Sequence, residues 1–332
     1  MHNINSTALI PNNLSRWGLI TLLFKGHQAL GGSWQELQFR LKFLARTLIS
    51  PKLTLNFLGT LAKQPFLNKM LRAQPDLPCK LHRPYLANTF NNRQKLSILQ
   101  DHFQLINQCI PESLRQGYLH HSPYKLTEII GKNEEKYFLY LCVIPKLNKE
   151  GEITLMLTNE QQQTLALLAF SLFYYQQQKT FFIGGLQGAN NETPHSEIHT
   201  STKACHGLFP KRLVLEAACN LAELMGITQV IAVGNATHIY QNWRYRAKKK
   251  DKLHADYDSF WLSLGGKPCA EGHFSLPSRI ARKPIESIAS KKRAEYRRRY
   301  QLLEQLESGL DSHFPHRQTT ATTATTANLP AL

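Results

Sequence analysis

Acidic residues are scarce in this sequence: 23 Asp and Glu stand against 40 Lys and Arg, giving a formal net charge of +17. Long apolar runs are missing as well. The apolar residues 17–24 end at Lys25, well short of the roughly 20 residues that a membrane-spanning helix needs. The N-terminus shows no charged segment followed by an apolar core. We therefore expect no transmembrane segment and a cytoplasmic location, with peripheral attachment at the inner membrane face as the alternative.

Cysteine pairs and cofactor motifs are absent too. The six cysteines form no C-x-x-C pair, and several lie in apolar runs such as residues 140–143, which is typical of reduced core cysteines in a reducing compartment. Neither the phosphate-loop motif GxxxxGKS/T nor the dinucleotide motif GxGxxG occurs, and HExxH is missing. The motifs therefore assign no metal and leave any cofactor unidentified.

The positive charge is concentrated at the two ends of the chain. Residues 1–85 carry 11 Lys and Arg against 2 Asp and Glu, residues 86–239 carry 12 against 12, and residues 240–299 carry 16 against 6. Such a distribution attracts nucleic acid, anionic lipid headgroups or phosphorylated ligands, and charge alone does not choose among them. Solvated basic faces without a partner are the alternative.

Composition divides the chain into four parts. In order, we expect a disordered N-terminus, a helical region, a mixed sheet core that ends in a basic helix, and a disordered Thr/Ala tail, at residues 1–12, 13–85, 86–310 and 311–332. Pro75, Pro78 and Pro84 mark the expected connection between the helical region and the core.

A helix predicted at residues 37–49 combines an apolar stripe with a cationic flank. The stripe consists of Leu37, Leu41, Leu44 and Ala45 at three- and four-residue spacing. The flank consists of Arg40, Lys42 and Arg46. A helix of this kind can lie on an anionic membrane, or it can pack its stripe on a domain core.

The second half of the chain predicts a sheet. A helix at residues 92–109 precedes closely spaced strands, for which antiparallel pairing is expected, at residues 137–144, 153–157, 165–175 and 180–184. Residues 181–233 then form a β-loop-α-β unit, with Pro210 in the first turn of its helix and Gly226 at its C-terminal cap. The predicted fold class is α+β, or mixed α/β, and a last helix is expected at residues 290–308.

The corner between loop and helix at residues 206–212 is the first candidate site. A helix N-terminus offers free N–H groups and a positive dipole end, and Lys211 and Arg212 add charge beside Gly207. We expect these three residues to bind a phosphate or pyrophosphate group. An ordinary helix start with two exposed cations is the alternative.

Candidate acid–base groups lie near this corner. The predicted long loop carries His195, His199 and His206, and a histidine there can act as a general base because its pKa lies near neutrality. Asp256 and Asp258, close to His254, could hold a metal, perform acid–base chemistry or cap a helix that begins before Phe260. We select His206 and Asp256 as candidate catalytic residues.

Two basic segments contain aromatic residues, at positions 244–252 and 291–299. Cations contact phosphates and rings stack on bases, so this composition suits nucleic acid, although no recognition-helix or RNP motif supports sequence-specific reading. The candidate polyanion-binding residues are Lys291, Lys292, Arg293, Arg297, Arg298 and Arg299. A solvated basic helix face is the alternative.

Four ordered motifs give the chain a family resemblance. They are GGLQG at residues 184–188, HGLFPKRL at 206–213, ADYDSFW at 255–261 and SKKRAEYRRRY at 290–300. Together they resemble the VirK/YbjX family of bacterial proteins over about residues 30–310. This resemblance implies a role in bacterial stress responses, including DNA damage, and in virulence and antimicrobial-peptide resistance. It implies no particular reaction.

The architecture of the β-loop-α-β unit is similar to the acyl-CoA-binding core of GNAT N-acyltransferases, in which such a corner grips the cofactor's pyrophosphate. This chain lacks that family's Q/R-x-x-G-x-G/A motif and has Gly207 beside Pro210. Two hypotheses follow. The first is an acyl-CoA-dependent acyltransferase. The second is a non-catalytic accessory protein whose basic ends bind nucleic acid or an anionic membrane surface.

Overall fold

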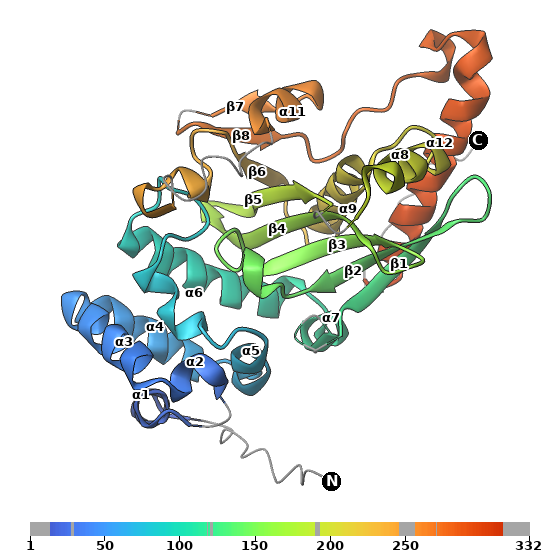
Figure 1. The fold of residues 1–332 in the computed structure, drawn as a ribbon. Helices are drawn as coiled ribbons and strands as arrows, with labels where there is room; N and C mark the ends of the chain where they lie inside the picture. The colour runs from blue at the N-terminus through green and yellow to red at the C-terminus, as the bar shows by residue number, and fades with distance from the viewer. Residues whose placement is uncertain are drawn as a thin grey trace, which may run out of the picture.

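The computed structural model describes residues 14–27, 30–117, 119, 122–189, 193–245, 256–269 and 271–314 (Figure 1). The segment expected to be disordered at residues 1–12 and most of the Thr/Ala tail lie outside these residues. The tail was predicted to begin at residue 311, but the last helix runs to Asp311 and Phe314 is buried behind it.

Helices form the first part of the chain, as predicted. They are α1 (Arg16–Lys25), α2 (Gly32–Gln35), α3 (Leu37–Ile49), α4 (Pro51–Ala62), α5 (Leu67–Ala73), the short 3₁₀ helix η2 (Leu77–His82), α6 (Asn92–Cys109) and α7 (Glu112–Gly117). Helix α6 packs against strand β4 of the sheet, and α4 packs on α6, so α1, α3 and α4 form an outer layer (Figure 1). Asn91 caps α6 in a capping box with Gln94.

Within the described residues one sheet of eight strands follows. The strands are β1 (Tyr124–Ile130), β2 (Lys136–Cys142), β3 (Ile153–Asn159), β4 (Thr164–Tyr175), β5 (Gln178–Gly188), β6 (Gln229–Val233), β7 (Lys267–Pro268) and β8 (His273–Leu276), in the spatial order 1-2-3-4-5-6-8-7. Strands β5 and β6 are parallel, and every other neighbouring pair is antiparallel. The predicted α+β class with a largely antiparallel sheet is confirmed. Strand β1 was not predicted.

The connection between β5 and β6 contains two helices, α8 (His195–Ala204) and α9 (Pro210–Leu224). Helix α9 begins at Pro210 and ends before Gly226, whose φ of 72° suits the predicted left-handed cap. The prediction of a long polar loop was wrong at residues 195–204. Helix α8 has Glu197 in its first turn and Lys203 in its last, which favours a helix through its dipole.

The remaining helices are η3 (Pro145–Leu147), η4 (Ile239–Gln241), α11 (Tyr257–Ser263), η6 (Ile285–Ser287) and α12 (Ser290–Asp311). Helix α9 packs on β3, β4 and β5, while α12 packs on α9 and β1. Together they cover the face of the sheet that α6 leaves open (Figure 1). The basic C-terminal helix predicted from residue 290 is therefore part of the folded core.

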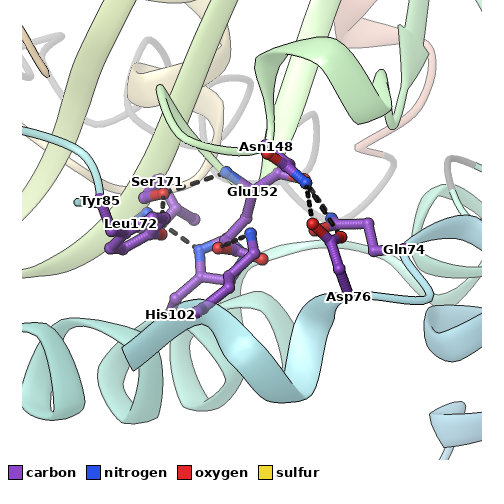
Figure 2. Close-up of polar contacts among 9 residues, drawn as sticks. Gln74, Asp76, Tyr85, His102, Asn148, Glu152, Ser171 and Leu172 are labelled. Atoms are coloured by element: carbon purple, nitrogen blue, oxygen red, sulfur yellow. Dashed lines mark hydrogen bonds and ion pairs between the residues drawn. The ribbon is translucent and has the colours of Figure 1, made fainter. Parts of the chain in front are cut away.

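A buried polar network joins the helical region to the sheet (Figure 2). The ammonium group of Lys80 pairs with the carboxylate of Glu152, and both side chains are almost fully buried. The N–H of Glu152 donates to Ser171 Oγ (3.2 Å), which lies 2.9 Å from Tyr85 Oη. In α6, His102 Nδ1 accepts from Leu172 N–H at 3.1 Å. The proline-marked stretch expected to be a connection is thus buried as η2 against the sheet.

Helix α3 turns a different face to the core from the one expected. Phe43 is buried in edge contact with Trp34, with ring centroids 5.2 Å apart. The stripe that could have packed on the core instead faces solvent: Leu37 is 62% exposed, Leu41 55% and, one turn beyond the stripe, Leu48 70%. Of the two alternatives for this stripe, packing on a core is not observed, because α3 has apolar residues on two sides and the aromatic side is the buried one.

Candidate anion-binding sites

The predicted corner is a strained turn followed directly by α9. His206 and Gly207 have positive φ values of 52° and 80°, and the N-cap residue Phe209 supplies no side-chain hydrogen bond. Arg299 of α12 closes this turn, since its Nε donates to His206 O at 2.8 Å. Its Nη2 lies 2.5 Å from the position that a Cβ at residue 207 would take, and the φ of 80° favours glycine there. The turn motif and the α12 motif are therefore parts of one contact.

The two cations of the corner point to different places. Arg212 forms an ion pair with Glu216, with Nη2 and Oε1 2.7 Å apart, and lines a cavity of about 360 Å³ together with Gly207 and Arg299. Lys211 instead extends along the end of β5, where its Cε lies 3.3 Å from the position of a Cβ at Gly188. Burial lowers the pKa of the Lys211 ammonium group. The corner thus does not present both side chains to one ligand.

The two candidate catalytic residues have separate environments. His206 is nearly buried, and burial together with the charge of Arg298 lowers its pKa. Asp256 caps α11: it accepts from Ser259 N–H at 3.2 Å and from Asn235 Nδ2 at 2.9 Å, and hydrogen bonding lowers its pKa. Among the described residues no hydrogen bond or ion pair joins the two. The helix-cap interpretation of Asp256 is confirmed, while its neighbour His254 lies outside the described residues.

The exposed histidines of the predicted loop, His195 and His199, lie on α8. Neither is drawn into the corner by a hydrogen bond or ion pair within the part of the chain that the structure describes. The described residues also contain no cluster of His, Cys, Asp and Glu able to hold a metal ion.

The polyanion-binding candidates on α12 divide into two groups. Arg293 donates to the carbonyl of Ile288 (2.9 Å), and Arg299 is held at the corner and stacks 4.2 Å from the centroid of the Tyr296 ring. These two arginines fasten α12 to its surroundings. The exposed members of the set are Lys291, Lys292, Arg297 and Arg298.

A buried carboxylate that sequence reasoning missed lies against the bulge of β5. Ala169 of β4 pairs with Gly185 and Phe170 pairs with Ile183, so Gly184 is the extra residue. Glu150 is fully buried, and its Oε2 lies 1.8 Å from where a Cβ at Gly185 would stand. The glycine pair in the GGLQG motif was its one signal.

Beyond this bulge, the backbone at the edge of β5 forms hydrogen bonds with a tyrosine side chain instead of with β6. Strand β6 pairs with β5 only as far as Ile183. Further along, Tyr257 Oη accepts from Leu186 N–H and donates to Leu186 O, both at 3.2 Å. Gln187 Nε2, next in the strand, donates to both oxygens of Glu150, at 2.8 and 3.0 Å. The two parallel strands therefore separate at a buried polar cluster.

A second site, the basic cleft, combines parts of both basic ends of the chain. We define it by its basic residues: the cations Lys42 and Arg46 of α3, Arg83 directly after η2, Lys149 and Arg244, with His82 at the end of η2. Together with Phe39 and Tyr245 they enclose about 330 Å³. An adjoining cavity of about 240 Å³ shares Arg46, Arg83 and Arg244 and adds Lys95 and Trp243. The sequence indicates the basic flank of α3 and the basic segment from residue 244, but it does not indicate that the two meet.

Positive charge dominates the electrostatics of the basic cleft. Neither cavity is lined by an acidic residue among those that the structure describes, and Asp76 reaches the cleft only through its ion pair with Arg83. Burial, then Arg46 and Arg83, lower the pKa of His82 to about 4, so this ring is neutral at pH 7. Burial and Arg244 lower the pKa of Lys95. Residues 246–252, which continue the basic segment, lie outside the described residues.

Hydrogen bonds and ring contacts hold residues 243–245, which line the cleft and the adjoining cavity. Arg244 Nη1 donates to His82 O at 3.2 Å, which fixes residue 244 against the end of η2. The guanidinium carbon of Arg244 lies 5.3 Å from the Trp243 ring centroid, and Lys149 Nζ lies 4.6 Å from that of Tyr245. Contacts with neighbouring residues therefore hold these side chains of the cleft in position. Their guanidinium and ammonium groups suit a phosphate-bearing ligand.

An α+β protein with a cationic cleft is thus the class that fold and site define. The profile of a family described as "Protein of unknown function (DUF535)" matches residues 32–312. The chain is 46% identical over 315 residues to "Uncharacterized protein YbjX" of Escherichia coli (strain K12), covering 95% of each chain. It therefore belongs to the YbjX family, as the four sequence motifs predicted.

More distant relatives come from a second bacterium. Two proteins of Haemophilus influenzae, each named "Uncharacterized protein", are 28% identical over 217 residues and 29% identical over 195 residues. These matches cover 65% and 55% of this chain, and 70% and 63% of the respective relatives. No solved structure matches the chain significantly, so the similarity to GNAT enzymes has no support from that comparison. Among the described residues no helix is long and apolar enough to cross a membrane.

Proposed function

We propose that the protein is an accessory protein that binds a phosphate-bearing anionic ligand in the basic cleft. The observation that carries this proposal is the convergence of Lys42, Arg46, Arg83 and Arg244 on one cavity of about 330 Å³ without an acidic residue in its described lining. Like charges held together in a partly desolvated site repel each other, and a polyanion relieves that repulsion. The physiological setting that the family resemblance implies, stress response and virulence, belongs to this proposal.

The chemistry of the cleft favours phosphate over a simple carboxylate ligand. Guanidinium groups donate in a planar fork that matches phosphate oxygens, and three arginines line the cavity. Arg83 is anchored by Asp76 and Arg244 by the carbonyl of His82, which limits the side-chain entropy lost on binding. In contrast, the cavity at the predicted corner is lined by the carboxylate of Glu216 beside Arg212, which opposes the binding of an anion there.

Calorimetric titration with inorganic phosphate and glycerol 3-phosphate at low salt tests the proposal. Replacing Lys42 and Arg46 by glutamine should weaken binding by about tenfold or more, because two charge-assisted contacts are lost. Lys52→Gln/Lys63→Gln is the matched control: it removes the same charge from exposed positions of α4 and the residue after it. Equal loss in both double variants would show that net charge, rather than the cleft, holds the anion.

A second candidate function, acyl-CoA-dependent acyl transfer, is favoured by the separation of β5 and β6. Ligands of α/β sheets bind at the carboxyl ends of parallel strands, and this is where Lys211 lies beside Gly188. In this candidate Lys211 and Gly207 hold the pyrophosphate. His206 is the base, since its lowered pKa favours the neutral ring. Asp256 is occupied in capping α11, so we assign it no catalytic role here.

Thermal unfolding with saturating acetyl-CoA or longer acyl-CoAs tests this second candidate. A rise in the melting temperature that disappears in Lys211→Ala would support it, because a ligand bound only to the native state stabilises that state. Arg212→Ala serves as the comparison, since Arg212 is paired with Glu216 and should matter less. The absence of any shift with acyl-CoA would remove acyl transfer from consideration.

A further inference from the structure

We infer that the phosphate-bearing partner of the basic cleft is the surface of an anionic lipid bilayer, into which α3 and Trp243 insert apolar side chains. This inference rests on the proposed function, since it names the source of the phosphate. It starts from the solvent-facing side of α3, where Leu37, Leu41 and Leu48 lie on one stripe, 62%, 55% and 70% exposed. Ile49, the last residue of the helix, is 81% exposed.

Helix α3 carries both the apolar stripe and part of the basic cleft. Lys42 and Arg46, which line the cleft, come from the same helix as the stripe. Ile49 and the 77% exposed Trp243 line the adjoining cavity together with Arg46 and Arg244. Two large exposed apolar side chains, Ile49 and Trp243, thus stand beside the arginines of a cationic site.

This combination identifies the partner by its chemistry. Nucleic acid would contact the cations through its phosphates and the aromatic rings through its bases, but it would leave the exposed leucine and isoleucine side chains without an apolar partner. A bilayer uses all of them: aliphatic side chains reach the acyl boundary, tryptophan prefers the interface, and Lys and Arg contact the phosphates of anionic lipids. A helix with a cationic flank and an apolar outer face is the form that such peripheral binding takes.

Flotation with lipid vesicles tests the inference. The full chain should bind vesicles containing about 30% phosphatidylglycerol and leave neutral phosphatidylcholine vesicles unbound at physiological salt. Lys42→Gln/Arg46→Gln should weaken binding about 30-fold, since each cation near such a surface contributes a factor of about five. Leu41→Gln/Leu48→Gln should weaken it about tenfold or more through lost apolar insertion. Because all four positions are exposed, the fold should survive.

Matched controls use exposed residues elsewhere. Lys52→Gln/Lys63→Gln controls for charge, and Leu262→Gln on α11, where Leu262 is 54% exposed, controls for apolar surface. Tryptophan emission should shift to shorter wavelength on vesicle binding, and Trp243→Phe should remove most of that shift. Trp17, 60% exposed on α1, is the tryptophan to compare with it.

Binding of glycerol 3-phosphate, compared with binding of vesicles, distinguishes a failure of the cleft proposal from a failure of the bilayer inference. If Leu41→Gln/Leu48→Gln still binds glycerol 3-phosphate but no longer binds vesicles, both the cleft and its bilayer partner are supported. Phosphate binding without vesicle binding by the unmodified chain would overturn the bilayer and keep the cleft. Binding of a DNA duplex instead, sensitive to Arg46 but not to Leu41, would replace the bilayer by nucleic acid. Self-association that disappears in Leu41→Gln/Leu48→Gln, without vesicle binding, would replace it by a second copy of the chain.

Discussion

Substitution in the buried ion pair between Lys80 and Glu152 tests how strongly this pair stabilises the attachment of the helical region to the sheet. Replacing Lys80 by methionine keeps the volume of the side chain but leaves the carboxylate of Glu152 buried without its cation (Figure 2). Removing one partner of a buried pair typically costs about 3–5 kcal/mol, because the remaining charge stays desolvated. A loss of that size should lower the melting temperature by roughly 5–10 °C.

The matching double variant separates the ion pair from the packing around it. Lys80→Met/Glu152→Leu removes both charges, and similar replacements of buried pairs are often neutral or stabilising. The N–H of Glu152, which donates to Ser171, is unaffected by the substitution. We therefore expect the double variant to recover most of the stability, measured as the urea midpoint. A loss below about 1 kcal/mol in Lys80→Met would refute the reasoning, since it would mean that water reaches Glu152.

Three further predictions concern packing, anchoring and pH. Gly185→Ala should lower the urea midpoint strongly because its Cβ would meet Glu150 at 1.8 Å, whereas Gly32→Ala, with no atom within 4 Å, should be neutral or stabilising. Arg299→Ala should speed amide exchange at the corner turn because the His206 carbonyl loses its donor, while Arg297→Ala, at an exposed position, should leave exchange unchanged. Stability should fall as the pH drops from 7 to 4. Burial lowers the pKa of four histidines in the folded chain, to about 4 at His82, His238 and His273 and to about 3 at His102, whereas in the unfolded chain histidines protonate near pH 6.5. A urea midpoint that does not change with pH over this range would contradict the prediction.

Hydrophobic periodicity predicted those elements whose apolar residues form one clear pattern. The helix at residues 92–109 was placed at the bounds that α6 has, and α9 was recognised from Pro210 and Gly226. Helix α8 was missed because its inward face carries little beyond Ile198, Ser201 and Ala204, too few apolar residues to give a period.

Which face of a helix packs cannot be read from a helix that has apolar residues on two sides. The stripe of Leu37 and Leu41 has regular spacing, yet Phe43 is the residue that packs against Trp34. The basic cleft was beyond prediction for a related reason. Its walls come from residues about 200 positions apart, Lys42 and Arg244, and no local signal reports that they meet.

Residues in each of the four motifs that indicated the family make contacts that hold the fold together. In GGLQG the glycines make room for Glu150, and in HGLFPKRL Gly207 makes room for Arg299. In ADYDSFW, Tyr257 pairs with the edge of β5 and Trp261 donates to Val233 O at 2.8 Å. Arginines of the α12 motif fasten that helix.

Tyr257 and Trp261 join α11 to strands β5 and β6, and Arg299 joins α12 to the turn before α9, so these motif residues hold parts of the molecule together. The cations of the basic cleft are Lys42 and Arg46 of α3, Arg83 after η2, Lys149 and Arg244, and all of them lie outside the four motifs. Substitutions in the motifs should therefore act first on stability. Substitutions at Lys42, Arg46 and Leu41 should act on binding while the unfolding midpoint stays near that of the unmodified chain, and this contrast is what makes the surface of α3 the place to test function.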